Sequence, residues 1–270
     1  MIFFQKKDQV KLEIKKLEKQ ERRFMLKRIN GKESRINKAF EGKVPRKLQE
    51  TLDAAFIKAF SAVFEKGTGI IEKTYDKSGM KKTFLVNEYA DEVYKTRKTL
   101  KEFSKGAGRA KAKNILISGV SGVGMGVIGV GVPDIPVFTA IMLKNIYETA
   151  LSFGFDYETE DERRFILLII QGAFSGGSGF KEIDNEINMC IEKGICQISR
   201  PVNELIKKAA ESISKEILYM KFIQGIVVIG AVGGFFDAVY MKRIAEYAEI
   251  KYRKRFLSEK IVQRTDGGKK

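Results

Sequence analysis

Apolar residues recur at helical spacing along most of the chain. Near the amino terminus Val10, Ile14, Leu17, Phe24 and Ile29 follow one another at three- to four- and seven-residue intervals, with Lys and Glu between them. This pattern predicts an amphipathic helix. A basic helix of this kind can lie on a membrane surface, or it can pack on the body of its own domain.

The same period predicts further helices, and period-two alternation typical of strands is scarce. The later helices are predicted at residues 44 to 75 (with a break at the glycines 67 and 69), 83 to 105, 134 to 154, 163 to 170, 181 to 193 and 201 to 217. Thr159 and Glu162 form a capping-box pair just before one of them. The sequence therefore predicts an all-α fold.

Two apolar segments, residues 115–132 and 222–236, are rich in glycine and carry no charge. Small residues on one helical face allow close approach to another helix, so we expect the two segments to pair. Eighteen helical residues reach about 27 Å, close to the thickness of a bilayer core, so the pair fits either a protein core or a membrane. The glycines expected on the paired faces are Gly119, Gly122, Gly126, Gly129, Gly230 and Gly234.

The first glycine segment also contains the spacing G-x-G-x-x-G at Gly124, Gly126 and Gly129. In dinucleotide-binding folds this motif joins a strand to an ordinary helix within a βαβ unit. Here Pro133 and Pro136 end the segment, and no such unit can be drawn around it. No Gly-Lys-Ser/Thr ending is present either, so a phosphate-binding loop is not supported.

The net charge of +16 is concentrated at the two ends of the chain. Residues 1–38 carry 13 Lys and Arg against 5 Asp and Glu, and residues 242–270 carry 10 against 4. Such ends indicate an anionic partner, either a membrane or nucleic acid, although a solvated surface is the plainer reading. If the two glycine segments cross a membrane as a hairpin, the basic run 95–113 and the basic tail 242–270 flank it, and the positive-inside rule would place both on the cytoplasmic side. The basic residues expected to contact a membrane are Lys242, Arg243, Arg253, Lys254 and Arg255.

The chain has no histidine, which excludes catalytic triads and metal sites that need an imidazole. Cys190 and Cys196 match no common metal or redox spacing, and we expect them to be core or surface thiols in a reducing compartment. Asp134 and Asp237 adjoin the glycine segments and are the candidate functional carboxylates, although helix capping by Asp134 and a helix–helix hydrogen bond to Asp237 explain them better. The acids at 156–162 could hold a hard cation, but a helix start explains them better. We assign no catalytic, cofactor-binding or metal-binding residue.

Several runs of residues resemble the EcsC family of bacterial proteins. They are Gly131-Val132-Pro133-Asp134-Ile135-Pro136, Leu143-Lys144-Asn145-Ile146-Tyr147-Glu148, Phe153-Gly154-Phe155-Asp156 with Glu162-Arg163, and Gly230 to Asp237 leading to Arg253-Lys254-Arg255-Phe256-Leu257. The resemblance covers residues 45–258 and leaves the first 40 residues outside. It implies an α-helical domain whose founding member is encoded beside an ABC transporter and is linked to secretion, without a catalytic mechanism.

These observations together predict a basic amino-terminal helix at 1–40, an EcsC-like helical domain at 41–258 and a basic disordered tail at 259–270. We expect a non-enzymatic accessory protein on the cytoplasmic side of the cell membrane, peripheral or shallowly inserted and without a cofactor. Its partner would be an anionic membrane surface or a membrane protein such as an ABC transporter. The alternatives are a soluble helical protein that binds nucleic acid through its basic ends, and a carboxylate-based enzyme.

Overall fold

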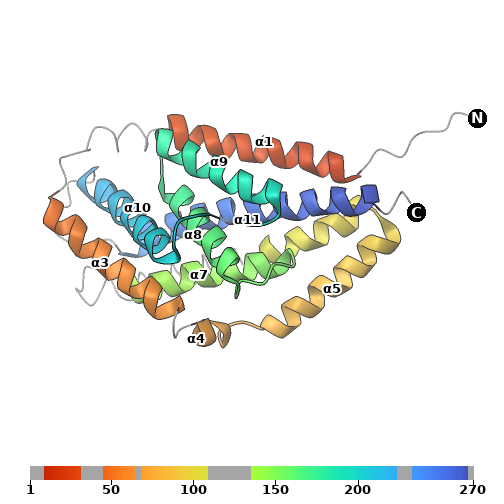
Figure 1. Cartoon of the computed structure of the whole chain (residues 1–270), viewed down its shortest axis with the longest axis horizontal. Coiled ribbons are helices and arrows are strands. Elements are labelled where there is room, and N and C mark those ends of the chain that lie inside the picture. The colour runs from red at the N-terminus through yellow and green to blue at the C-terminus, as the bar shows by residue number, and fades with distance from the viewer. Residues whose placement is uncertain are drawn as a thin grey trace, which may run out of the picture.

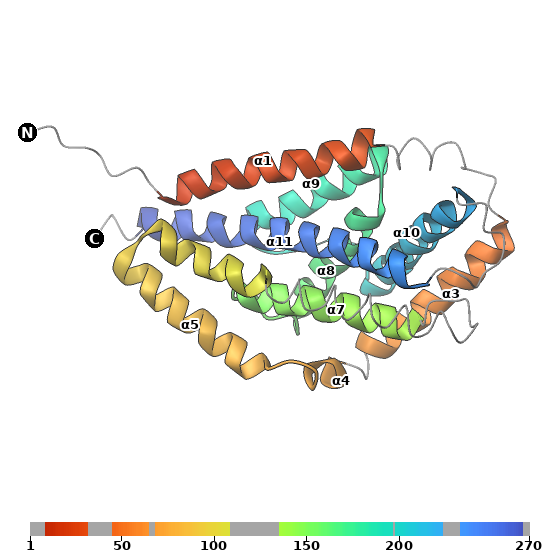
Figure 2. The same ribbon diagram turned by 180° about the vertical axis from the view of Figure 1, so that it is seen from behind.

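A computed structural model describes residues 9–31, 45–64, 68–108, 135–196, 198–223 and 233–266. These ranges are helical and contain no strand, which confirms the all-α fold (Figures 1 and 2). The helices are Gln9–Asn30 (α1), Arg46–Ala62 (α3), Thr68–Glu72 (α4), Lys77–Tyr94 (α5), Ile135–Ser152 (α7), Glu160–Phe174 (α8), Gly177–Lys193 (α9), Val202–Ile223 (α10) and Gly233–Asp266 (α11). Residues 97–108 are helical as well.

Helix α8 lies at the centre of the fold. It begins as the sequence predicts, because the Thr159 hydroxyl accepts a hydrogen bond from the Glu162 backbone N–H at 3.2 Å. Every residue from Phe165 to Phe174 is buried, and a helix that is apolar on all sides is surrounded by protein. Helices α9, α10 and α11 pack against it.

Helix α11 runs for 34 residues along the long axis of the molecule. Helices α1 and α7 both pack against it. In both views α1 forms the upper edge of the molecule, and α4 and α5 form the lower edge (Figures 1 and 2). The sequence allowed the amino-terminal helix to lie on a membrane or to pack on its own domain. In the structure α1 packs on the domain, against α9 and α11.

Two helix boundaries differ from the sequence prediction. The helix expected at 83 to 105 begins earlier, at Lys77, and ends at Tyr94, because Lys95 adopts a left-handed conformation with φ of 47°. Helix α11 continues to Asp266, so residues 259–266 are helical and not a disordered tail. Lys260 and Arg264 hold this end in place, with nitrogens 2.6 Å from Glu88 and 2.9 Å from Asp91 of α5.

The first glycine segment at 115–132 lies outside the described residues, together with Asp134 and Gly230. Gly234 and Asp237 lie at the start of α11. The pairing of the two segments therefore stays a prediction. Among the residues that the structure describes, no helix combines the length and apolar character needed to cross a bilayer.

Candidate functional site

Helix α1 has two faces of different chemistry. Its inner face buries Val10, Leu17 and Phe24 in the hydrophobic core. Glu13 and Glu21 lie on that same face and are buried too. A buried carboxylate is costly unless a cation accompanies it, so the docking of α1 depends on what faces these two acids.

Basic side chains of α11 supply the missing cations. The Glu21 carboxylate lies 2.6 Å from Lys251 Nζ and 2.9 Å from Lys254 Nζ. The Glu13 carboxylate lies 2.5 Å from the Arg253 guanidinium and also pairs with Lys16 and Arg97 at 2.8 Å. Burial alone would raise the pKa of both acids, but these partners outweigh it and hold each pKa below 4.5.

Lys251 is the innermost of these cations, with 0% of its side chain exposed. Its Nζ lies 2.7 Å from Asp184 of α9 and donates to Asn188 Oδ1 at 3.0 Å. The Tyr247 hydroxyl donates to the same Asp184 carboxylate at 2.7 Å. One lysine thus joins α1, α9 and α11, and it needs the acids of both neighbouring helices to balance its charge.

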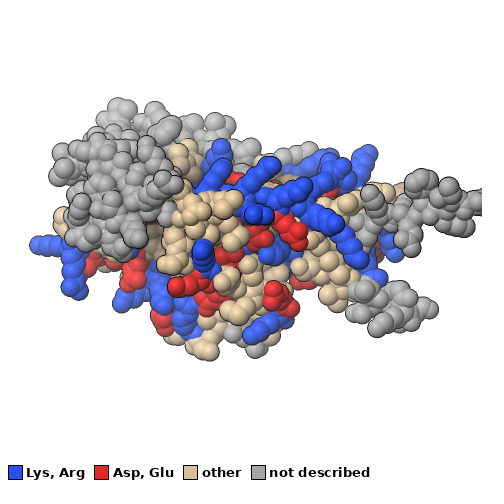
Figure 3. Space-filling view, turned by 90° about the horizontal axis from the view of Figure 1, so that it is seen from above, with Lys and Arg blue, Asp and Glu red and all other residues tan. Residues whose placement is uncertain are grey.

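The outer face of α1 is strongly basic. Seven cations on it are exposed, against Glu18 as the one exposed acid of the helix. They are Lys11, Lys15, Lys16, Lys19, Arg22, Arg23 and Lys27. Only Lys16 of the seven forms an ion pair with a described residue. Viewed from above, Lys and Arg side chains gather over this helix (Figure 3).

The basic ridge of α1, which we define as Lys11, Lys15, Lys19 and Arg22, follows from helical spacing. Residues three and four apart lie on one face of a helix, and the four side chains extend along about 16 Å of the helix axis. Because α11 supplies cations to the buried Glu13 and Glu21, the cations of the basic ridge are available to solvent or to an anionic partner. This ridge is the candidate functional site.

The five basic residues that the sequence suggested as membrane contacts lie on α11, and four of them point into the fold. Arg243 is buried with its guanidinium 2.6 Å from Glu216, and Arg255 pairs with Glu162 at 2.6 Å. Arg253 and Lys254 pair with α1, as described above. Lys242 alone of the five is exposed. Of the two basic helices at the ends of the chain, α1 is therefore the one that exposes its cations, because acids on neighbouring helices pair with most of the cations of α11.

Sequence reasoning missed this division of charge between the two helices. The signal was present, since Glu13 and Glu21 fall on the same helical face as Val10, Leu17 and Phe24. Acids inside an apolar stripe indicate buried charge that needs a partner. The sequence does not say which distant cation supplies it.

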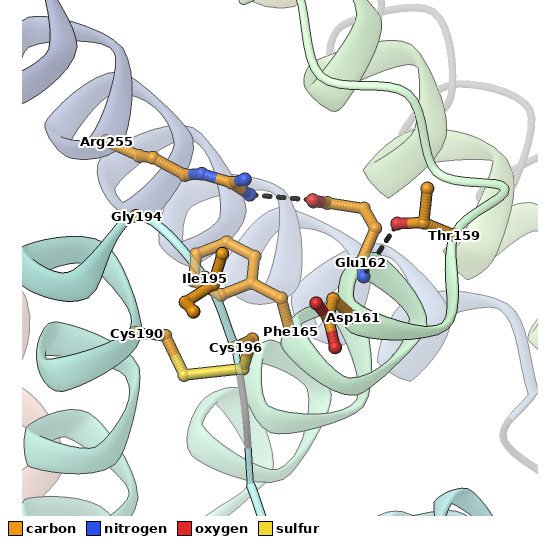
Figure 4. A pocket seen from close by; sticks show the side chains of 9 residues that line it. All are labelled: Thr159, Asp161, Glu162, Phe165, Cys190, Gly194, Ile195, Cys196 and Arg255. Carbon is orange, nitrogen blue, oxygen red and sulfur yellow. Dashed lines mark hydrogen bonds and ion pairs between the residues drawn. A yellow bond between two sulfur atoms is a disulfide. The ribbon is translucent and has the colours of Figure 1, made fainter.

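A small pocket of about 150 Å³ lies between α8, α11 and the end of α9 (Figure 4). Its lining residues are Thr159, Asp161, Glu162, Phe165, Cys190, Gly194, Ile195, Cys196 and Arg255. Ligand pockets usually exceed about 300 Å³, and the charges here are matched already. Glu162 accepts from Arg255 and from the Tyr252 hydroxyl, at 2.6 and 2.7 Å. This pocket offers no free group for chemistry.

The two cysteines beside the pocket form a disulfide, so the expectation of two thiols is wrong. Gly194 ends α9 in the left-handed conformation, with φ of 72°. This turn brings Cys196 back to Cys190, and the two Cα atoms are 4.5 Å apart. A turn between two cysteines six positions apart is a tertiary detail that cysteine spacing alone does not reveal.

The acids at 156–162, weighed above as a cation site, are paired with basic side chains. Asp156 and Glu158 contact Lys81 and Lys77, each at 2.6 Å. Glu160 and Asp161 both contact Arg164. Within the described ranges no group of three or more Cys, Asp or Glu side chains is arranged to hold a metal ion.

Comparison of the sequence with models of known protein families finds a match to one family. The model of the EcsC protein family matches residues 8–257, so the match includes α1, which we expected to lie outside it. Protein EcsC from Bacillus subtilis (strain 168) is 26% identical over 154 residues, which is 55% of this chain and 58% of that relative. The matched region thus spans little more than half of the relative's length. No solved structure matches the chain.

Proposed function

This chain belongs to the EcsC protein family, and we propose that it is a non-enzymatic accessory protein that attaches to an anionic membrane surface through the basic ridge of α1. The observation that supports the proposal is the contrast between the two sides of α1, with its acids buried against α11 and its cations exposed. Each Lys or Arg near an anionic bilayer contributes about 1 kcal/mol of attraction.

The experiment is cosedimentation of the full chain with vesicles of phosphatidylcholine alone and with phosphatidylglycerol added. We expect binding to the anionic vesicles, weak binding to the neutral ones and a loss as salt rises, because charges are screened beyond roughly 8 Å at physiological ionic strength. Binding that survives high salt would indicate shallow insertion of the apolar segments. Equal binding to both vesicle types would contradict the proposal.

Nucleic acid is the competing anionic partner, since a row of cations also fits a phosphate backbone. The ridge lacks the groove-reading motifs that give sequence specificity, and an extended bilayer can meet all four cations together. Tight, salt-sensitive binding to duplex DNA or RNA, together with no binding to vesicles, would replace the membrane proposal with the nucleic-acid one.

We propose the cytoplasmic face of the membrane as the location, and a membrane protein such as an ABC transporter as the protein partner there. The resemblance to a family linked to such transport supports the partner. The disulfide between Cys190 and Cys196 counts against this location, because the cytosol keeps thiols reduced. Alkylation of intact cells followed by mass spectrometry decides the point: two modified cysteines would support the cytoplasmic face, and an unmodified disulfide would place the domain in an oxidising compartment.

A further inference from the structure

The outer face of α5 carries an apolar stripe that the fold leaves open to solvent. Leu85, Val86, Tyr89 and Val93 are between 55% and 71% exposed. They recur at one-, three- and four-residue intervals, so they share one face of the helix. The opposite face packs against the domain through Phe84 and the buried Asp91. Both ribbon views place this helix at the lower edge of the molecule, away from α1 (Figures 1 and 2).

Each end of the stripe carries a charge, and the two charges are opposite. Lys82 lies at its amino-terminal end and Glu92 at its carboxy-terminal end, and both side chains are exposed. Neither forms an ion pair with a described residue. The stripe with these two ends, residues 82 to 93, is called the α5 face below.

Two pairs of residues on the α5 face match each other in the antiparallel direction. Leu85 and Tyr89 have residue 87 as their midpoint, and Lys82 and Glu92 have the same midpoint. A two-fold axis at residue 87 therefore brings Leu85 of one copy opposite Tyr89 of the other. The same axis brings each Lys82 within reach of the other copy's Glu92. A two-fold interface repeats each contact twice.

We propose that a second copy of this chain covers the α5 face, giving a symmetric dimer in which two α5 helices pack antiparallel. An anionic bilayer suits this face less well, because Glu92 would lie against negative headgroups. In a second copy, by contrast, each Glu92 finds a Lys82 and each Leu85 finds a Tyr89. The dimer leaves the basic ridge of α1 uncovered, so this inference is independent of the membrane proposal.

The test is sedimentation equilibrium of the full chain and of charge-reversed variants, up to about 100 µM, where a dimer with a micromolar Kd is largely formed. Lys82→Glu places two acids at each end of the interface, and Glu92→Lys places two bases there. Because each change acts twice, each variant alone should dimerise about tenfold more weakly than the wild type.

Mixing the two variants gives the decisive result. A chain with Glu at both positions and a chain with Lys at both positions are complementary at each end, so the mixture should form heterodimers with near wild-type affinity. The double variant Lys82→Glu/Glu92→Lys should dimerise normally as well. Lys58→Glu on α3, at a lysine that is also exposed, is the matched control and should change nothing. Far-UV circular dichroism confirms that each variant is folded.

A wild-type chain that stays monomeric over this range would overturn the proposal. So would single reversals that dimerise as well as the wild type, or a mixture no better than its components. A monomer whose binding to vesicles falls when Tyr89 is changed to Ser would assign the α5 face to a bilayer and would likewise overturn the dimer.

Discussion

Replacing Lys251 by Met tests how the basic ridge is held in place. The Lys251 ammonium is completely buried and balances two carboxylates, Glu21 at 2.6 Å and Asp184 at 2.7 Å. Removing one partner of a buried ion pair typically costs about 3–5 kcal/mol, because it leaves uncompensated charge in the interior. Glu21 keeps Lys254 and Asp184 keeps the Tyr247 hydroxyl, so we expect a loss near the lower limit, about 3 kcal/mol.

Urea unfolding followed by circular dichroism measures this loss, and hydrogen exchange of the α1 amides should show that α1 loosens first. Lys254→Met is the matched control, since Lys254 also pairs with Glu21 but is 32% exposed. We expect it to cost less than about 1 kcal/mol, as for other ion pairs near solvent. Adding Asp184→Asn to Lys251→Met removes one uncompensated acid and should recover part of the loss. A Lys251→Met variant no less stable than Lys254→Met would refute this account of α1.

Three further outcomes follow from other parts of the structure. Cys196→Ser opens a loop of seven residues closed by Cys190, and thermal unfolding should show a loss of about 2 kcal/mol; no change in an oxidised sample would contradict the disulfide. The pKa of Glu21 is held below 4.5 in the folded protein, so its stabilisation is complete above that pH and is lost as the pH falls through the lowered pKa. Urea midpoints from pH 7 to about 3 should therefore fall less steeply for Glu21→Gln than for the wild type. Gly172→Ala would place a methyl group 2.6 Å from the buried Tyr247 ring, and its melting temperature should reflect about 1–3 kcal/mol of overpacking; a normal melting temperature would show that the ring can move aside.

The helices are largely predictable from local signals. The hydroxyl of Thr159 starts α8 as its capping pattern indicates, and the period of Val10, Leu17 and Phe24 identifies both α1 and its buried face. The break at Lys95 was not predictable, because a left-handed lysine has neither the glycine nor the proline that usually marks a helix end.

The carboxy-terminal end and the candidate site depend on contacts between residues far apart in sequence. Residues up to Asp266 are helical because Lys260 and Arg264 reach carboxylates of α5, and no local pattern encodes that. In the same way, the sequence alone suggests that the basic side chains of α11 are exposed to solvent. Only the fold shows that Glu13, Glu21, Glu162 and Glu216 take up its charges.

The central claim is that the basic ridge of α1 carries the attraction to an anionic membrane. The most direct measurement compares vesicle affinities of two variants in which four exposed cations become Gln. One variant changes the basic ridge, Lys11, Lys15, Lys19 and Arg22, and the other changes Lys47, Lys58, Lys73 and Lys207 on the rest of the surface. At about 1 kcal/mol for each cation near the bilayer, the ridge variant should bind on the order of a thousandfold more weakly. The second variant should stay close to the wild type, and equal losses in the two variants would contradict the claim.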